Sequence, residues 1–82
     1  MKLLKFFGEW CNPCKQQSKL LENFKTVPII EIDVDEEPDM AGDFNIRSLP
    51  TMILVDDENK EITRFVGLTK IEEIETFIDE NN

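Results

Sequence analysis

The sequence contains no histidine, and Cys11 and Cys14 are its only cysteines. Structural zinc sites take four Cys or His ligands, so one copy of the chain cannot assemble such a site, and we expect no bound metal. Two cysteines separated by two residues can instead pass reversibly between a dithiol and a disulfide. The pair therefore favours redox chemistry.

Positive charge is scarce as well. The chain has 9 Lys and Arg residues against 18 Asp and Glu residues, which gives a net charge of −9. Nucleic acids and anionic membrane surfaces would repel such a chain, so we expect neither as its main partner.

Long apolar runs are absent too, and no stretch approaches the ~20 apolar residues that span a bilayer. The apolar run in residues 1–7 is too short for a secretory signal peptide and is followed by Gly8, Glu9 and Trp10. A close cysteine pair in a chain without a targeting segment fits a reducing compartment, where such pairs are more often catalytic or metal-binding than structural. We therefore predict a cytoplasmic protein.

What the chain does contain is a regular alternation of apolar segments. Residues 2–7 place apolar side chains on both faces, which is typical of a strand covered by helices on both sides. Three further strands are predicted over residues 28–34, 50–55 and 61–66. The last two are joined by five polar residues, a loop short enough for an antiparallel hairpin.

Helical patterns fill the remaining segments. Residues 11 to about 25 predict a helix that turns Leu20, Leu21 and Phe24 toward a sheet and its Lys and Gln side chains toward water. Pro13 fits its first turn. A short helix is predicted at about residues 40–44. The closing helix has a capping-box signal at Thr69 and Glu72. Its apolar stripe consists of Ile71, Ile74, Phe77 and Ile78.

The element order is β-α-β, a short helix, then β-β-α. This order predicts an α/β fold, a three-layer α/β/α sandwich around a four-stranded mixed sheet. With 82 residues, of which 40% are apolar, the chain can bury one hydrophobic core. We predict a single domain over residues 1–82.

Four segments, in order, resemble the thioredoxin family. They are Phe6–Lys15, Ile32–Pro38, Phe44–Thr51 and Phe65–Lys70. The resemblance covers essentially the whole chain, although the strand and helix that usually precede the position of Lys2 are missing. The chain is thus similar to the minimal thioredoxin and glutaredoxin core.

The resemblance implies roles for particular residues. Cys11 matches the exposed nucleophile and Cys14 the buried resolving thiol. Pro50 matches the family's cis proline beside the disulfide, which leaves the backbone of Leu49 free to bind an extended substrate segment. The residues assigned to substrate binding are Trp10, Asn12, Pro13, Leu49, Pro50 and Gly67.

Three positions depart from the family pattern. Asn12 replaces the usual Gly, and Lys19 replaces a proline that kinks the helix, so we expect a straighter helix. Lys5 stands where a buried carboxylate is usual, and Glu31 stands where its Lys partner is usual. We expect these two to form a partly buried ion pair beneath the cysteines, with Glu31 as proton acceptor and Lys5 stabilising a thiolate.

A thiol at the start of a helix lies near unpaired backbone N–H groups and the positive end of the helix dipole. These lower the pKa of Cys11 from about 8.5 toward the range of roughly 3.5 to 7.5 found for activated cysteines. Cys11 would then attack a substrate disulfide, and Cys14 would resolve the mixed disulfide.

The predicted function is a protein thiol-disulfide oxidoreductase, an electron carrier of cell redox homeostasis that reduces protein disulfides through a Cys11/Cys14 dithiol cycle. The resemblance implies no bound cofactor, a thioredoxin-reductase-like flavoprotein as reductant and disulfide-containing client proteins; we expect a monomer.

Three alternatives stay open. A glutaredoxin-type reductase would depend on glutathione, but this chain has no Tyr and few cations. The chain could also be a non-catalytic binding subunit of a larger enzyme, or two copies could share a metal or iron–sulfur site through their cysteine pairs.

Overall fold

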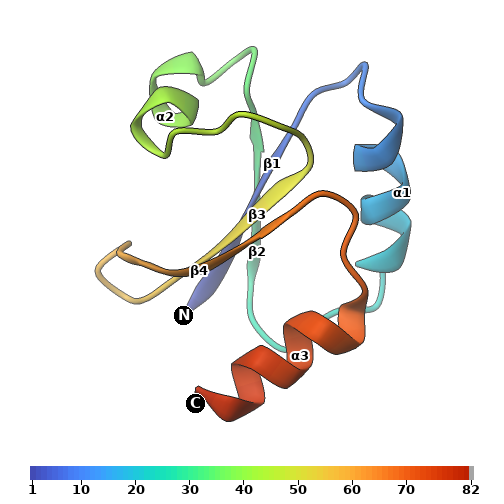
Figure 1. Ribbon diagram of the computed structural model, residues 1–82, viewed down its shortest axis with the longest axis vertical. Helices are drawn as coiled ribbons and strands as arrows, with labels where there is room; N and C mark the ends of the chain where they lie inside the picture. The colour runs from blue at the N-terminus through green and yellow to red at the C-terminus, as the bar shows by residue number, and fades with distance from the viewer. Residues whose placement is uncertain (82) are drawn as a thin grey trace.

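The computed structural model describes residues 1–81 and contains a four-stranded sheet in the order β2-β1-β3-β4 (Figure 1). β1 pairs in parallel with β2 and antiparallel with β3, which in turn pairs antiparallel with β4. The sheet is therefore mixed, as predicted. Its strands are β1 (Lys2–Phe7), β2 (Ile29–Asp33), β3 (Thr51–Val55) and β4 (Glu61–Val66).

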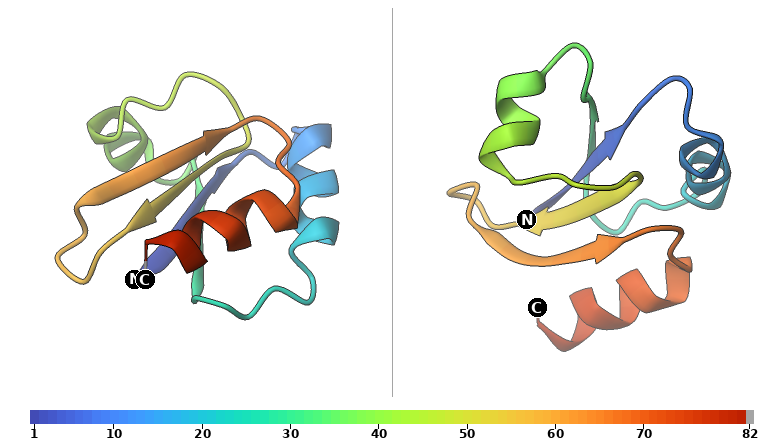
Figure 2. Two further views of the ribbon diagram at one scale, coloured as in Figure 1. Left: turned by 60° about the horizontal axis from the view of Figure 1, so that its bottom comes forward. Right: turned by 45° about the horizontal axis from the view of Figure 1, so that its top comes forward.

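Three helices cover the two faces of this sheet, and their arrangement is visible in Figure 2. α1 (Asn12–Leu20) and α3 (Ile71–Glu80) lie on one face, and α2 (Pro38–Asp43) lies on the other. β1 contributes side chains to the cores on both faces, because successive side chains of a strand point in opposite directions. The predicted three-layer sandwich is thus confirmed.

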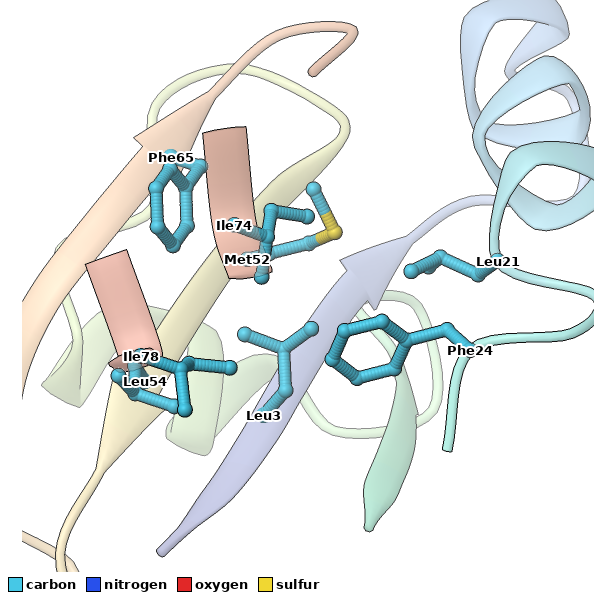
Figure 3. Close-up of a cluster of buried hydrophobic side chains, with 8 residues drawn as sticks. All are labelled: Leu3, Leu21, Phe24, Met52, Leu54, Phe65, Ile74 and Ile78. Atoms are coloured by element: carbon cyan, nitrogen blue, oxygen red, sulfur yellow. The ribbon is translucent and has the colours of Figure 1, made fainter. Parts of the chain in front are cut away.

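The larger of the two apolar cores lies between the sheet and α3, and Figure 3 shows its side chains. Ile74 and Ile78 of α3 are almost completely buried in it, and Ile71 and Phe77 pack at its edge. The predicted apolar stripe of the closing helix is therefore confirmed. The members of this core are Leu3, Leu21, Phe24, Met52, Leu54, Phe65, Ile74 and Ile78.

The second core lies beneath α2. Leu4, Phe6 and Ile32 contribute to it from β1 and β2, and Met40 and Phe44 pack against it from α2 and its C-cap. The rings of Phe6 and Phe44 lie 5.6 Å apart. This core fixes α2, and with it the chain that leads to β3, against the sheet.

The first helix is shorter than predicted. α1 ends at Leu20, because Leu21 caps it and the N–H of Phe24 bonds to the carbonyl of Leu21 in a turn. Leu21 and Phe24 are buried as predicted, but Leu20 is 45% exposed. The apolar periodicity continues through a turn that brings Phe24 back to the core, which is why the sequence suggested a longer helix.

The predicted capping box at the start of α3 is wrong. Lys70 is the N-cap and makes no side-chain capping bond. The hydroxyl of Thr69 donates instead to the carbonyl of Gly67, and the Thr69 N–H donates to the side chain of Gln17. A tertiary contact has replaced the local capping motif.

Arg64 ties β4 to the end of α2. Its Nη2 donates to the carbonyl of Phe44 at 2.9 Å and to Glu61 Oε1 at 2.7 Å, and its Nε donates to Glu61 Oε2. The guanidinium holds the pKa of the Glu61 carboxyl below its usual value, and the carboxylate raises the pKa of Arg64. This contact supports the segment between α2 and β3, whose residues 46–49 lie next to Cys11.

The carboxyl ends of β1 and β4 and the start of β3 meet at one end of the sheet, beside the first turn of α1 (Figures 1 and 2). Within residues 1–81, none of the helices has the length and apolar character that crossing a bilayer requires.

Candidate active site

Cys11 is the N-cap of α1, in extended conformation at φ −90° and ψ 107°. The backbone N–H of Cys14 donates to Cys11 Sγ at 3.2 Å, so a sulfur takes the place of the usual capping oxygen. Pro13 lies in the first turn as predicted, where its missing N–H leaves no helical hydrogen bond unmade. The Cα atoms of Cys11 and Cys14 are 5.2 Å apart, and the two sulfurs are joined in a disulfide.

Both cysteines are buried in this oxidised form. Cys11 is 5% exposed and Cys14 is 3% exposed. The expectation of a buried Cys14 is confirmed, whereas that of an exposed Cys11 is wrong for the disulfide. The Cys11 sulfur is bonded to the Cys14 sulfur, accepts the Cys14 N–H and lines a groove, and little of Cys11 is open to solvent.

This groove has a volume of about 500 Å³. Its lining comes from residues 10–13, from Val34 and Ala41, and from the segment 46–49. Four of the six predicted substrate-binding residues line it, namely Trp10, Asn12, Pro13 and Leu49. A largely apolar groove at the cysteine pair can hold an extended segment of another protein.

The other two predicted substrate-binding residues, Pro50 and Gly67, are not part of the lining of this groove. Pro50 is buried and follows a cis peptide bond from Leu49, as the resemblance implied. Gly67 adopts φ +83° and donates its N–H to the Pro50 carbonyl at 2.8 Å. The segment around Gly67 is thus hydrogen-bonded to the segment that carries the groove wall.

Trp10 forms an open wall of the groove, with 67% of its surface exposed. Its Nε1 donates to Asp35 Oδ2 at 3.1 Å, which links the segment before α1 to the loop after β2. The indole also covers Gly8, where an added Cβ would lie 2.8 Å from Trp10 Cε2. Gly8 therefore leaves space for the groove wall.

Lys5 is 2% exposed, although it carries a charge. Its Nζ donates to Glu31 Oε1 at 3.0 Å and to Ser18 Oγ, and it lies 5.5 Å from the centre of the Phe7 ring. Lys5 and Glu31 are opposite each other in the parallel register of β1 and β2. The ion pair expected from the sequence is present, with Glu31 59% exposed at the outer end.

Cys14 shares a cavity with this ion pair. The cavity has a volume of about 330 Å³, and its lining includes Lys5, Cys14, Ser18 and Glu31. A buried charge costs free energy unless it is paired and hydrogen-bonded, and Lys5 is both. The structure therefore places a fixed positive charge and a carboxylate on the side of Cys14 away from the groove.

Two residues of this site were not predicted. Ser18, which holds Lys5, follows Cys14 by four positions on α1, and Gln17, which is completely buried, follows it by three. We expected Gln17 to face water, but its helical spacing from Cys14 and Leu21 could have indicated the inward face.

No group of three or more His, Cys, Asp or Glu side chains is placed to hold a metal ion in the part of the chain that the structure describes.

Comparisons with known proteins agree with this geometry. The thioredoxin family model matches residues 1–80. A thioredoxin of Chlamydia trachomatis is 41% identical over 70 residues, which cover 80% of this chain and 68% of that protein. A thioredoxin of Chlamydia pneumoniae is 37% identical over 83 residues, which cover 96% of this chain and 80% of that protein.

Solved structures are similar as well. A thioredoxin variant from Halobacterium salinarum superposes with a TM-score of 0.87 at 27% identity, covering 96% of this chain and 72% of that one. A thioredoxin from Nicotiana alata gives a TM-score of 0.82 at 32% identity, covering 96% and 70% of the two chains.

The contact between Gly8 and Trp10 generates a prediction. In Gly8→Ala the added methyl group displaces the indole and separates it from Asp35. Because Trp10 is the only tryptophan, its fluorescence emission will move to longer wavelength, and reduction of protein disulfides will slow several-fold. The matched control is Gly42→Ala on α2, where a Cβ meets nothing within 4 Å. An emission spectrum of Gly8→Ala identical to that of the wild type would contradict the prediction.

Proposed function

The chain belongs to the thioredoxin family and is a thiol-disulfide oxidoreductase, and we propose that it reduces protein disulfides with Cys11 as nucleophile and Cys14 as resolving thiol. The observation that carries this proposal is the disulfide at the N-terminus of α1, with Cys11 Sγ on the groove side and Cys14 beside the cavity of Lys5 and Glu31.

The cycle begins with the reduced dithiol. The Cys11 thiolate attacks one sulfur of a client disulfide, the client S–S bond breaks, and the leaving sulfur takes a proton to become a thiol. Cys14 then loses its proton and attacks Cys11 Sγ, which breaks the mixed disulfide and releases the second client thiol. Two electrons pass from the dithiol to the client, and the protein is left with the Cys11–Cys14 disulfide.

The position of Cys11 supports its role as nucleophile. As N-cap it receives the Cys14 N–H at 3.2 Å, and it lies at the positive end of the α1 dipole. Both interactions strengthen when the sulfur carries a negative charge, so both favour the thiolate. Cys11 also lines the groove that a client would occupy.

The second step requires that Cys14 lose its proton. We propose that Glu31 accepts this proton, directly or through water in the shared cavity, and that the fixed charge of Lys5 stabilises the Cys14 thiolate. The cavity, at about 330 Å³, is large enough to hold water, and the charged side chains of Lys5 and Glu31 lie in its lining. Ser18 holds Lys5 in place, so the cation stays near the cavity rather than turning to solvent.

The groove would hold the client. Trp10, Asn12, Pro13 and Leu49 line it and would contact an extended client segment. Pro50 follows Leu49 directly, and the Gly67 N–H is bonded to the Pro50 carbonyl, so both residues would hold the segment that carries Leu49 in place.

Members of the thioredoxin family are generally reduced by thioredoxin reductase and act on disulfide-containing clients. We propose that a flavoprotein of this kind reduces Cys11–Cys14, and that the chain acts as a monomeric electron carrier of redox homeostasis in the cytoplasm. The glutaredoxin-type and binding-subunit alternatives are not favoured, because the family model and the relatives are thioredoxins.

Insulin reduction tests the proposed function. Thioredoxin reductase with NADPH should support turnover, glutathione alone should not, and replacing both Cys11 and Cys14 with Ser should abolish it. Turnover with glutathione at the rate seen with the reductase would contradict the thioredoxin assignment, and a double variant that retained full activity would contradict the dithiol cycle.

The role of Glu31 gives a separate prediction. In Glu31→Gln the proposed proton acceptor is lost while the side-chain size is kept, so resolution of the mixed disulfide above neutral pH should slow by about tenfold or more. Stopped-flow measurement of client thiol release would follow this step. Glu22→Gln, which removes an exposed charge elsewhere, is the control. An unchanged resolution rate in Glu31→Gln would exclude Glu31 as the acceptor.

A further inference from the structure

Gln17 is the one amide side chain of α1, the helix that carries Cys14, that is completely buried, with 0% of its surface exposed. It lies one turn after Cys14 on the inner face of α1. Its Nε2 donates to the Thr69 carbonyl at 3.1 Å, and its Oε1 accepts the Thr69 N–H at 2.8 Å. Both ends of the amide are therefore paired with the backbone of a single residue.

This pairing resembles the two bonds that a hydrogen-bonded residue pair exchanges between antiparallel strands. Two parallel contacts fix the orientation of Thr69 as well as its distance from α1. An apolar side chain at this position could fill the same space, but it would leave the buried N–H and carbonyl of Thr69 unpaired, which is costly.

The pairing continues toward the groove through further hydrogen bonds. The Thr69 hydroxyl donates to the Gly67 carbonyl at 2.9 Å, and the Gly67 N–H donates to the Pro50 carbonyl at 2.8 Å. Pro50 follows Leu49, which lines the groove beside Cys11. A continuous series of contacts thus runs from the helix that carries Cys14 to the wall of the groove.

The segment held in this way presents apolar side chains to solvent. Val66 and Leu68, on either side of Gly67, are 60% and 52% exposed. Gly67 has φ +83°, a conformation that other residues rarely adopt, so the chain turns sharply between the two. Without the Gln17 contact, one end of this turn would lose its attachment to α1.

We propose that Gln17 is a positioning residue for client binding: by holding Thr69, it sets the place of the 66–69 segment relative to the Cys11–Cys14 pair. The inference rests on the proposed reduction of protein disulfides. It adds that α1 itself aligns the 66–69 segment, which an extended client contacts. A small disulfide needs only the cysteines, whereas a protein client needs the aligned segment too.

The test compares a protein disulfide with a small one. In single-turnover experiments, the reduced Gln17→Leu variant is mixed either with insulin or with dithiobis(nitrobenzoate), a small aromatic disulfide. The rate constant for insulin should fall by about tenfold or more, as expected when a binding surface moves relative to the reacting group, and that for the small disulfide should stay unchanged. Gln16→Leu, at the neighbouring exposed glutamine, should change neither.

Thr69 provides a second pair of variants that does not depend on the folding of Gln17→Leu. Thr69→Val removes the hydroxyl bond to Gly67 but keeps the backbone pairing with Gln17, and Thr69→Ser keeps both. Thr69→Val should show the same selective loss with insulin, and Thr69→Ser should restore the rate.

Two results would overturn the inference. Insulin reduction at the wild-type rate in Gln17→Leu or Thr69→Val would show that the segment needs no alignment. Parallel losses with both disulfides would place the effect at the cysteine pair itself. A wild-type protein that reduces neither disulfide would instead contradict the proposed function, so the two failures are distinguishable.

Discussion

The hydrogen bond from the Cys14 N–H to Cys11 Sγ is the contact on which the rest of the site depends. It exists because β1 ends beside the place where α1 begins, and because Cys11 is the residue at which extended chain becomes helix. A sulfur at this point receives an N–H that no helical carbonyl can satisfy. The same geometry brings the second sulfur, one turn on, within bonding distance of the first. Local helix structure thus supplies both the activation of one sulfur and the proximity of the other.

The surroundings of the pair divide its two sulfurs between different environments. Cys11 lines a largely apolar groove, where another protein can approach, whereas Cys14 lines a cavity that also contains the charged pair of Lys5 and Glu31. Lys5 is almost fully buried, but Glu31 reaches solvent. A buried cation that cannot turn away, paired with a carboxylate in contact with water, suits a step in which a proton must leave the interior. Relative to the pattern that the family resemblance implies, the acid and the base have exchanged strands, and in this chain the cation is the buried member of the pair.

Much of the fold could be predicted from the sequence because strand and helix periodicities are strong in segments such as residues 2–7 and 61–66. The pairing of Lys5 with Glu31 was also predicted, because the family resemblance places an ion pair at these two positions, and the register of β1 and β2 sets them opposite each other. The errors have a common cause. Gln17 is polar and was turned toward water, and Thr69 matched a local capping motif, but the two residues satisfy each other across the molecule. Contacts between residues 52 positions apart leave no local pattern. The burial of Cys11 likewise depends on groove walls that come from distant segments.

The most direct test of this account is the pKa of the Cys11 thiol in the reduced Cys14→Ser variant. This variant has one sulfur left to titrate and keeps the residue-14 N–H that reaches Cys11 Sγ. Ultraviolet absorbance of the thiolate, followed against pH and checked by the pH dependence of alkylation, gives the value. The account predicts a pKa well below the ordinary thiol value of about 8.5. A pKa at or above that value would show that the start of the helix does not activate Cys11, and would contradict the mechanism.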